Sequence, residues 1–250
     1  MLVTVIIPTF NRAALITRAI RSVLRQTGDT ALDVLVVDDG SVDETASVVA
    51  DVMTHHPEVR YLYQENAGVS AARSAGLQHL LPQTSFVTFL DSDDVLSEGR
   101  LDADLPCFTR NPALDLTYAR MSIVSQIDNE TLLPTPDAQV TNVVGIHLSC
   151  AIFRRELVER IGLFNPELRQ SEDTDYLLRI FESGSKFQQT DTLAFYYVRH
   201  HQNMTLDRKE AGRCFARALL LSVMRRRKDP SLVLDKPSFE LKQLQEIEVD

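Results

Sequence analysis

Four short apolar runs punctuate the first part of the chain, and their spacing limits the folds open to it. They cover residues 2–7, 32–37, 59–63 and 86–90, and apolar residues at helical spacing follow each of the first three. Near-continuous apolar runs are typical of parallel strands that are buried on both faces. Strands that alternate with helices predict a parallel sheet with right-handed crossovers, which is a Rossmann-like α/β/α sandwich.

The chain after residue 95 has a less regular pattern. Apolar spacing predicts helices at 100–108, 154–161, 171–181 and 208–228, and apolar runs predict strands at 114–119, 146–153 and 193–198. Residues 125–142 are polar and contain two prolines, which is typical of an excursion or a flexible loop. The polar stretch after residue 228 is expected to be loosely held. The whole pattern predicts an α/β domain with a mainly parallel central sheet and a C-terminal helical extension.

Three carboxylates follow the fourth apolar run within four residues. They belong to Asp91, Asp93 and Asp94, and the run before them ends at Leu90. In open α/β sheets ligands bind beyond the carboxyl ends of the strands, so this cluster lies where a ligand is expected. Like charges at this spacing repel unless a cation neutralises them, and carboxylate oxygens suit Mg²⁺ or Mn²⁺. The sequence favours a metal site, and a turn with an aspartate helix cap is the alternative.

Turn-forming and polar residues also follow the other three strands: Pro8 and Thr9, then Asp39, then Asn66, Gly68 and Arg73. The carboxylate of Asp39 is placed to accept a hydrogen bond from a ring N–H of a base, and a turn aspartate is the alternative. Arg73 suits a phosphate, with a solvated helix arginine as the alternative.

A second group of carboxylates, Glu172, Asp173 and Asp175, opens a predicted helix. A carboxylate at a helix start is usually a cap, but a doublet also suits a general base with a neighbour that orients it. His200 and His201 follow the last predicted strand. There a neutral imidazole suits a metal or a phosphate, and a surface loop is the alternative.

Charge and cysteine content exclude several classes of protein. The net charge of −9 argues against a nucleic-acid partner, which needs a basic footprint. Neither a Gly-x-Gly-x-x-Gly nor a Gly-x-x-x-x-Gly-Lys loop occurs, so the two commonest nucleotide motifs of such sheets are missing. Three widely spaced cysteines favour neither a zinc site nor a disulfide framework, and they predict a reducing compartment.

Hydropathy predicts a cytoplasmic protein. The sequence has no apolar run of about 18 residues and no basic start before its first apolar run, so we expect neither a membrane span nor a signal peptide. The helix at 208–228 joins an apolar segment to the basic run 225–228. This helix is expected to pack on the domain, or alternatively to lie on the anionic inner face of a membrane.

Five short motifs resemble those of the family-2 inverting glycosyltransferases of the GT-A fold, in the same order. They lie at 8–12, 36–43, 64–73, 90–94 and 171–175, and the resemblance covers about residues 1–205. It implies a nucleotide-binding half over 1–94 and an acceptor-binding half over 95–205, followed by a helix and polar tail over 206–250. It also implies a nucleotide-sugar donor, usually uridine-linked, a divalent Mn²⁺ or Mg²⁺, and a saccharide or lipid-linked saccharide acceptor in polysaccharide or glycoconjugate synthesis.

Carried over by position, the resemblance assigns a role to each motif residue. Asp173 would be the catalytic base. The metal would be held by Asp93, with Asp91, Asp94 and His200 as further candidates. Nucleotide and substrate binding would involve Pro8, Thr9, Asn11, Arg12, Asp39, Asn66, Gly68, Arg73, Asp91, Ser92 and Glu172. Two other functions stay open: another metal-dependent enzyme that handles phosphate, and a non-catalytic domain that binds a nucleotide-sugar.

Overall fold

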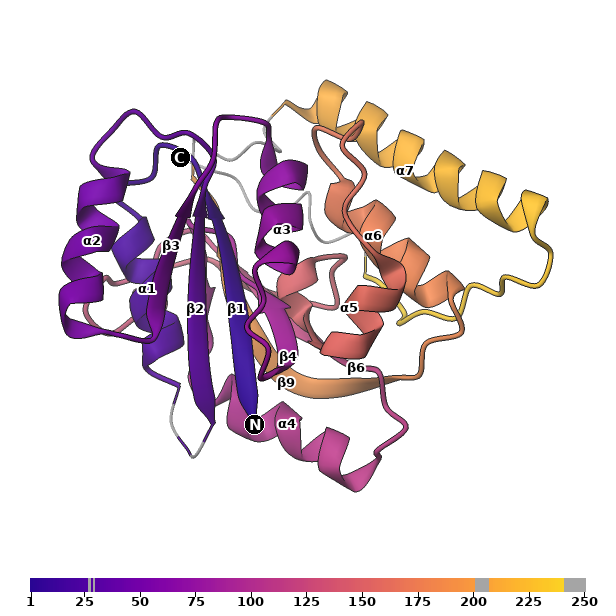
Figure 1. Ribbon diagram of the computed structural model, residues 1–250, viewed down its shortest axis with the longest axis horizontal. Helices are drawn as coiled ribbons and strands as arrows, with labels where there is room; N and C mark the ends of the chain where they lie inside the picture. The colour runs from indigo at the N-terminus through magenta and orange to yellow at the C-terminus, as the bar shows by residue number, and fades with distance from the viewer. Residues whose placement is uncertain (27, 29, 201–206, 241–250) are drawn as a thin grey trace.

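The computed structural model describes residues 1–26, 28, 30–200 and 207–240. Strands β1 (Leu2–Thr9), β2 (Ala31–Asp38), β3 (Val59–Tyr63) and β4 (Thr84–Phe89) form its first half together with helices α1 (Ile16–Leu24), α2 (Thr45–His55) and α3 (Val69–Gln78). The four strands are parallel and lie in the order β3-β2-β1-β4. The four predicted strands and three predicted helices are therefore confirmed, and their arrangement is visible in Figure 1.

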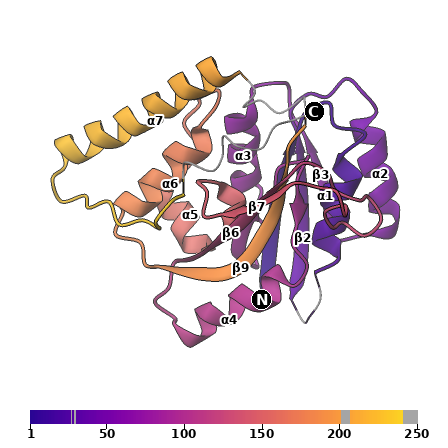
Figure 2. The same cartoon turned by 180° about the vertical axis from the view of Figure 1, so that it is seen from behind.

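The second half extends the same sheet. Its strands are β5 (Val95–Leu96), β6 (Leu116–Val124), β7 (Val140–Val143), β8 (Ala151–Arg154) and β9 (Phe187–Val198). The order continues β4-β8-β6-β9-β5, with β7 paired to β6. Strand β8 runs antiparallel to both β4 and β6, whereas β9 runs parallel to β6. Figure 2 shows β9 crossing the molecule in front of β6 in that view. The whole sheet is mixed: its first half is parallel, and the antiparallel pairings involve strands of the second half.

Several sequence-based boundaries in this half were wrong. The strand expected at 146–153 is instead a short 3₁₀ helix, η1 (Leu148–Cys150), followed by the four residues of β8. The strands expected at 114–119 and 193–198 are longer than predicted, and β5 was not expected. These elements depend on pairing with distant strands, which a local apolar pattern does not report.

The polar excursion at 125–142 is more ordered than expected. Its last residues form β7, and Ile127 and Leu132 are buried against Val124 and Val198. Arg25, the residue that follows α1, donates to backbone carbonyls at the tip of the excursion. The loop is therefore fastened to the first half of the domain, and the expectation of a flexible loop was wrong.

Helices α4 (Arg100–Arg110), α5 (Arg155–Ile161), α6 (Glu172–Glu182) and α7 (Arg208–Lys228) complete the fold. Figure 1 shows α7 lying along α6, on the side of the molecule away from α2. Buried apolar residues from both halves form one continuous core. Within the described residues, no helix combines the length and the apolar character needed to cross a bilayer.

Ion pairs join α7 to α6. Arg225 donates from Nε to Glu182 Oε2 and from Nη1 to Asp175 Oδ1, each over 2.7 Å. Both carboxylate side chains are only 2% exposed. Because a buried carboxylate needs a partner, these contacts specify how α7 sits on α6.

Residues 229–240, which follow α7, contact the sheet and α6. Phe239 packs its ring against Tyr118 and Phe181, and the Glu240 amide donates to the Val144 carbonyl over 2.9 Å. The expectation of a loosely held tail was wrong for residues 229–240. Residue 206 and residues 241–250 lie outside the described residues.

Candidate active site

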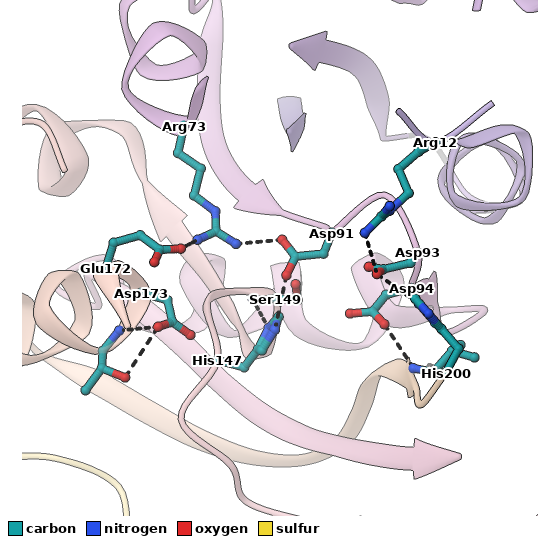
Figure 3. Close-up of polar contacts among 12 residues, drawn as sticks. Arg12, Arg73, Asp91, Asp93, Asp94, His147, Ser149, Glu172, Asp173 and His200 are labelled. Carbon is teal, nitrogen blue, oxygen red and sulfur yellow. Dashed lines mark hydrogen bonds and ion pairs between the residues drawn. The ribbon is translucent and has the colours of Figure 1, made fainter. Parts of the chain in front are cut away.

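A cleft of about 970 Å³ opens beyond the carboxyl ends of β1, β2 and β4. Its far wall comes from the start of α6, the end of β9 and the first turns of α7. Most of the residues singled out from the sequence line it together: Pro8, Thr9, Arg12, Asp39, Asn66, Gly68, Arg73, Asp91, Ser92, Asp93, Glu172 and Asp173. The strand-end motifs and the distant Glu172-Asp173 doublet therefore share one cavity, as Figure 3 shows for several of them.

Asn11 ties the loop after β1 to the loop after β2. Its backbone amide donates to Ser41 Oγ over 2.8 Å, and its side-chain Oδ1 accepts from the backbone amide of Val42 over 2.9 Å. The residue has a φ of 51°, a left-handed conformation that asparagine tolerates better than most residues. These contacts give Asn11 a structural part in shaping the rim, and its predicted contact with substrate stays a prediction.

Asp39 organises the loop between β3 and α3. Its Oδ1 accepts from Gln64 Nε2 and the Ala67 amide, and its Oδ2 accepts from the Gly68 amide over 2.8 Å. Asn66 Nδ2 donates to the Asp39 carbonyl over 2.8 Å. Gly68 has a φ of 91°, which favours glycine, so that its amide can turn towards Asp39. The Asp39 carboxylate thus shapes the loop before α3, whereas Asp38 accepts the turn hydrogen bond from the Ser41 amide after β2; the contact of Asp39 with a base stays a prediction.

Arg73 links two carboxylates across the cleft. Its side chain is buried, with Nη2 donating to Asp91 Oδ1 over 2.6 Å and Nη1 to Glu172 Oε1. Burial raises the pKa of Glu172 to about 7, although the ion pair with Arg73 acts in the opposite direction. The geometry makes Arg73 a bridge between the two acidic motifs rather than a solvated helix arginine, and its contact with a phosphate stays a prediction.

Asp91 lies at the centre of the site. Its Oδ1 accepts from Arg73, and its Oδ2 lies 3.4 Å from His147 Nε2. Burial acts to raise the pKa of Asp91, but Arg73 and His147 outweigh it and hold this pKa well below its usual range. Figure 3 shows the Asp91 carboxylate between the side chains of Arg73 and His147.

His147 is a residue of the cleft that sequence reasoning missed, as it missed Gln170 and Arg199. It stands in an apolar stretch that was interpreted as part of a strand, and its importance comes only from contacts with Asp91 and β9. A histidine directly after Gly145-Ile146, in a segment expected to be buried, was the one available signal.

Asp93 and Asp94 point to different partners. Asp93 Oδ2 lies 3.0 Å from His200 Nε2 and 3.9 Å from Arg12 Nη2. Asp94 is fully buried, and its Oδ1 accepts from the Val198 amide over 3.0 Å. No described residue donates a hydrogen bond to Asp94 Oδ2.

The acidic cluster fits a divalent cation. Burial, and then the charges of Asp93 and Asp91, raise the pKa of Asp94 well above its usual value. An orphaned buried oxygen beside two further carboxylates is relieved by a bound cation. Donor atoms of Asp91, Asp94 and His147 lie within 4.8 Å of one another. This group differs from the predicted set, in which Asp93 is the first ligand and His200 a further candidate. The alternative His201 lies outside the described residues.

Asp173 faces the cleft from the first turn of α6. Ser171 is the N-cap residue, and its side chain makes no capping hydrogen bond. Asp173 Oδ1 accepts from the first-turn amide of Thr174 over 2.6 Å, so a capping part for Asp173 is present beside its predicted catalytic role. The side chain is half-buried and lines the cavity opposite the Asp91–Asp94 loop. A carboxylate in this position can reach an acceptor held in the cleft.

Comparison with known proteins gives a family match. The family model described as glycosyl transferase family 2 matches residues 4–162. Chondroitin synthase of Escherichia coli is 27% identical over 212 residues, which is 82% of this chain and 30% of that protein. EpsJ of Bacillus subtilis (strain 168), an uncharacterized glycosyltransferase, is 25% identical over 82% of this chain and 63% of its own length. The chain thus spans 30% and 63% of the lengths of these curated relatives.

Solved structures share the fold at low sequence identity. TarS 1–349 of S. aureus in complex with UDP-GlcNAc aligns with a TM-score of 0.67 at 20% identity, covering 90% of this chain and 66% of that one. The mannosyltransferase PcManGT from Pyrobaculum calidifontis, in complex with GDP-Man and Mn²⁺, aligns with a TM-score of 0.66 at 20% identity, covering 89% and 64%. These likenesses confirm the predicted GT-A type α/β fold.

Proposed function

Because the chain belongs to glycosyl transferase family 2, we propose that it moves a sugar from a nucleotide-diphosphate donor to an acceptor hydroxyl with inversion. The observation that carries this proposal is the single cleft that joins the Asp91–Asp94 cluster to Asp173. A UDP-sugar is the first donor to test, since S. aureus TarS was solved with UDP-GlcNAc. Relatives such as chondroitin synthase and the B. subtilis minor teichoic acid biosynthesis protein GgaA support a place in polysaccharide or glycoconjugate synthesis.

The acidic loop is the proposed site of a divalent Mn²⁺ or Mg²⁺. Asp93 and Asp94 would hold the ion, with Asp91, His147 and His200 beside them. When bound, a divalent ion neutralises the diphosphate and makes it a better leaving group. PcManGT, solved with GDP-Man and Mn²⁺, supports this choice of ion class.

Asp173 is the proposed general base. Its carboxylate takes the proton from the acceptor hydroxyl as that oxygen forms a bond to the anomeric carbon. The bond from the anomeric carbon to the diphosphate oxygen breaks on the opposite face, and its electron pair leaves with the nucleoside diphosphate. This single displacement inverts the configuration and requires no covalent enzyme intermediate. Arg73 and Glu172 support it by tying the first turn of α6 to Asp91.

We assign donor binding to residues 1–94 and acceptor binding to residues 95–205, with residues 206–250 as an extension. The proposed acceptor is a saccharide or a lipid-linked saccharide, and the proposed location is the cytoplasm at the inner face of the membrane. Leu219, Leu220 and Met224 are exposed on α7, next to its basic C-terminal end at 225–228. This combination suits an anionic bilayer. We expect the protein to co-sediment with anionic vesicles and not with neutral ones. Failure to co-sediment with anionic vesicles would exclude the membrane contact, and equal recovery with neutral vesicles would exclude the part of the basic run.

Two variants test the separation of roles. We expect Asp93→Ala and Asp173→Asn each to abolish transfer, while only Asp93→Ala weakens Mn²⁺-dependent donor binding measured by calorimetry. Equal loss of donor binding in both variants would defeat the assignment. A thermal-shift panel of UDP-, GDP- and dTDP-sugars with and without Mn²⁺ identifies the donor to use. Binding of that donor with no product from any acceptor would favour the non-catalytic alternative.

A further inference from the structure

The ring of His147 is held by contacts on several sides. Its Nδ1 accepts a hydrogen bond from the backbone amide of Ser149 over 3.2 Å. Its faces and edges pack on two aromatic residues of β9, with ring centroids 4.7 Å from Phe195 and 5.9 Å from Tyr197. The buried hydroxyl of Tyr118 accepts from the His147 amide over 3.1 Å. The imidazole therefore has one orientation imposed by β6, β9 and η1.

The contact with Ser149 determines which ring nitrogen carries the proton. A backbone amide can only donate, so Nδ1 must present its lone pair to Ser149. In the neutral imidazole the proton is then on Nε2. This nitrogen lies 3.4 Å from Asp91 Oδ2, so the protonated side of the ring is next to a carboxylate oxygen.

This tautomer conflicts with a role as a metal ligand. A metal needs a ring nitrogen with a free lone pair, and Nε2 has none while it carries the proton. The opposite tautomer would set the hydrogen of Nδ1 against the hydrogen of the Ser149 amide. The closeness of His147 to Asp91 and Asp94 therefore does not make it part of a coordination set.

Building on the proposed function, we propose that His147 is a positioning residue: its Nε2–H holds Asp91 Oδ2, and its imidazole does not bind the cation. Arg73 donates to the other oxygen over 2.6 Å, so the Asp91 carboxylate lies between the guanidinium and the imidazole, with one oxygen next to each. A carboxylate oxygen has a second lone-pair site, which remains for a hydroxyl of the donor nucleotide. His147 thereby sets the angle at which Asp91 meets that hydroxyl; Figure 3 shows the Asp91 carboxylate between Arg73 and His147.

The tautomer can be tested without turnover. In protein labelled with ¹⁵N-histidine, long-range ¹H–¹⁵N correlation spectra distinguish a protonated from an unprotonated ring nitrogen. The signals of His147 are those that disappear in His147→Gln. We expect a protonated Nε2 and an unprotonated Nδ1, both without metal and with saturating Mg²⁺. A protonated Nδ1 in either condition would overturn the proposal.

Binding measurements test the role. His147→Phe keeps a ring against Phe195 and Tyr197 but has no donor, whereas His147→Gln keeps an N–H at similar reach. Hydrogen bonds to charged groups are strong, so His147→Phe should raise the Kd for UDP with saturating Mg²⁺ by roughly tenfold or more, and His147→Gln should recover most of the affinity. The Kd for Mn²⁺ without nucleotide, measured by electron paramagnetic resonance, should stay within about threefold of wild type in both variants.

Two outcomes would refute the role. Loss of Mn²⁺ affinity in both variants would make His147 a ligand, and an unchanged Kd for UDP in His147→Phe would leave it only a packing role. His55→Gln, an exposed change at the end of α2, is the matched control. Wild-type protein that binds no UDP would contradict the proposed donor, while the ring-nitrogen spectra would still report on His147 itself.

Discussion

Replacing Arg225 with methionine tests how far α7 supports the helix that carries Asp173. Methionine keeps an unbranched apolar stem and removes the guanidinium, so Asp175 and Glu182 lose one partner each. Removing one member of a buried ion pair typically costs about 3–5 kcal/mol, because a charge is left uncompensated. Asp175 lies two positions after Asp173 on the first turns of α6, so a disturbance there reaches the proposed base.

The loss of stability in Arg225→Met should be smaller than this range, because both carboxylates keep other partners. Asp175 keeps Arg179 at 3.1 Å, and Glu182 keeps Ser222 and also Arg226 at 3.6 Å. The Arg225 side chain is itself 27% exposed, so solvent screens part of its charge. We therefore expect the free energy of unfolding to fall by about 2–3 kcal/mol. For a chain of this size the melting temperature should fall by roughly 4–12 °C.

Thermal denaturation followed by circular dichroism measures the loss, and steady-state kinetics measures kcat separately from the KM for the donor. We expect kcat to fall severalfold and the donor KM to stay unchanged, since α7 acts on the α6 side of the cleft. Arg213→Met is the matched control on the same helix, because its ion pair with Glu210 is largely exposed, and its effect should stay within about 0.5 kcal/mol. An equally small effect of Arg225→Met would refute the reasoning.

Three further changes have expected outcomes. Asp94→Asn replaces a buried carboxyl whose charged form is disfavoured by burial and by the charges of Asp93 and Asp91, so urea unfolding at pH 7 should show equal or about 1 kcal/mol greater stability, while calorimetry shows weaker Mn²⁺ binding. The pKa of Glu172 is raised to about 7 in the folded protein, so the free energy of unfolding of the wild type should fall as the pH rises from about 4.5 to 7. In Glu172→Gln this fall should be smaller by up to about 3 kcal/mol, as measured by urea titrations across the same pH range. Gly68→Ala meets no steric clash but imposes a side chain at a φ of 91°, so it should cost about 1–2 kcal/mol in the same assay, and a neutral result would show that the loop relaxes.

The first half of the fold could be predicted because its signals are local. Each apolar run from Leu2 to Phe89 is long enough to be a strand by itself, and each connection carries its own turn residues. The strand ends then bring Thr9, Asp39 and Asp91 to one edge of the sheet, as the parallel topology requires.

The rest depended on contacts between distant segments. Strand β5 has only two residues and forms because β9 pairs with it. Strand β7 likewise forms because it pairs with β6. His147 could not be recognised as a site residue without knowing that η1 places its ring beside Asp91. Phe239 likewise belongs to a polar stretch, and only the position of Tyr118 gives it a place to pack. Residue types alone do not report such pairings.

The position of β9 in the sheet has a consequence for the order in which the protein matures. The acidic loop is complete in sequence at Asp94, but the amide that holds this carboxylate belongs to Val198, 104 positions later. Contacts between such distant segments form slowly, and synthesis delivers the N-terminal half first. In a nascent chain Asp94 therefore lacks this amide until β9 has emerged and paired with β5 and β6. The capacity to bind a cation and a nucleotide should therefore arise as one of the last steps of folding.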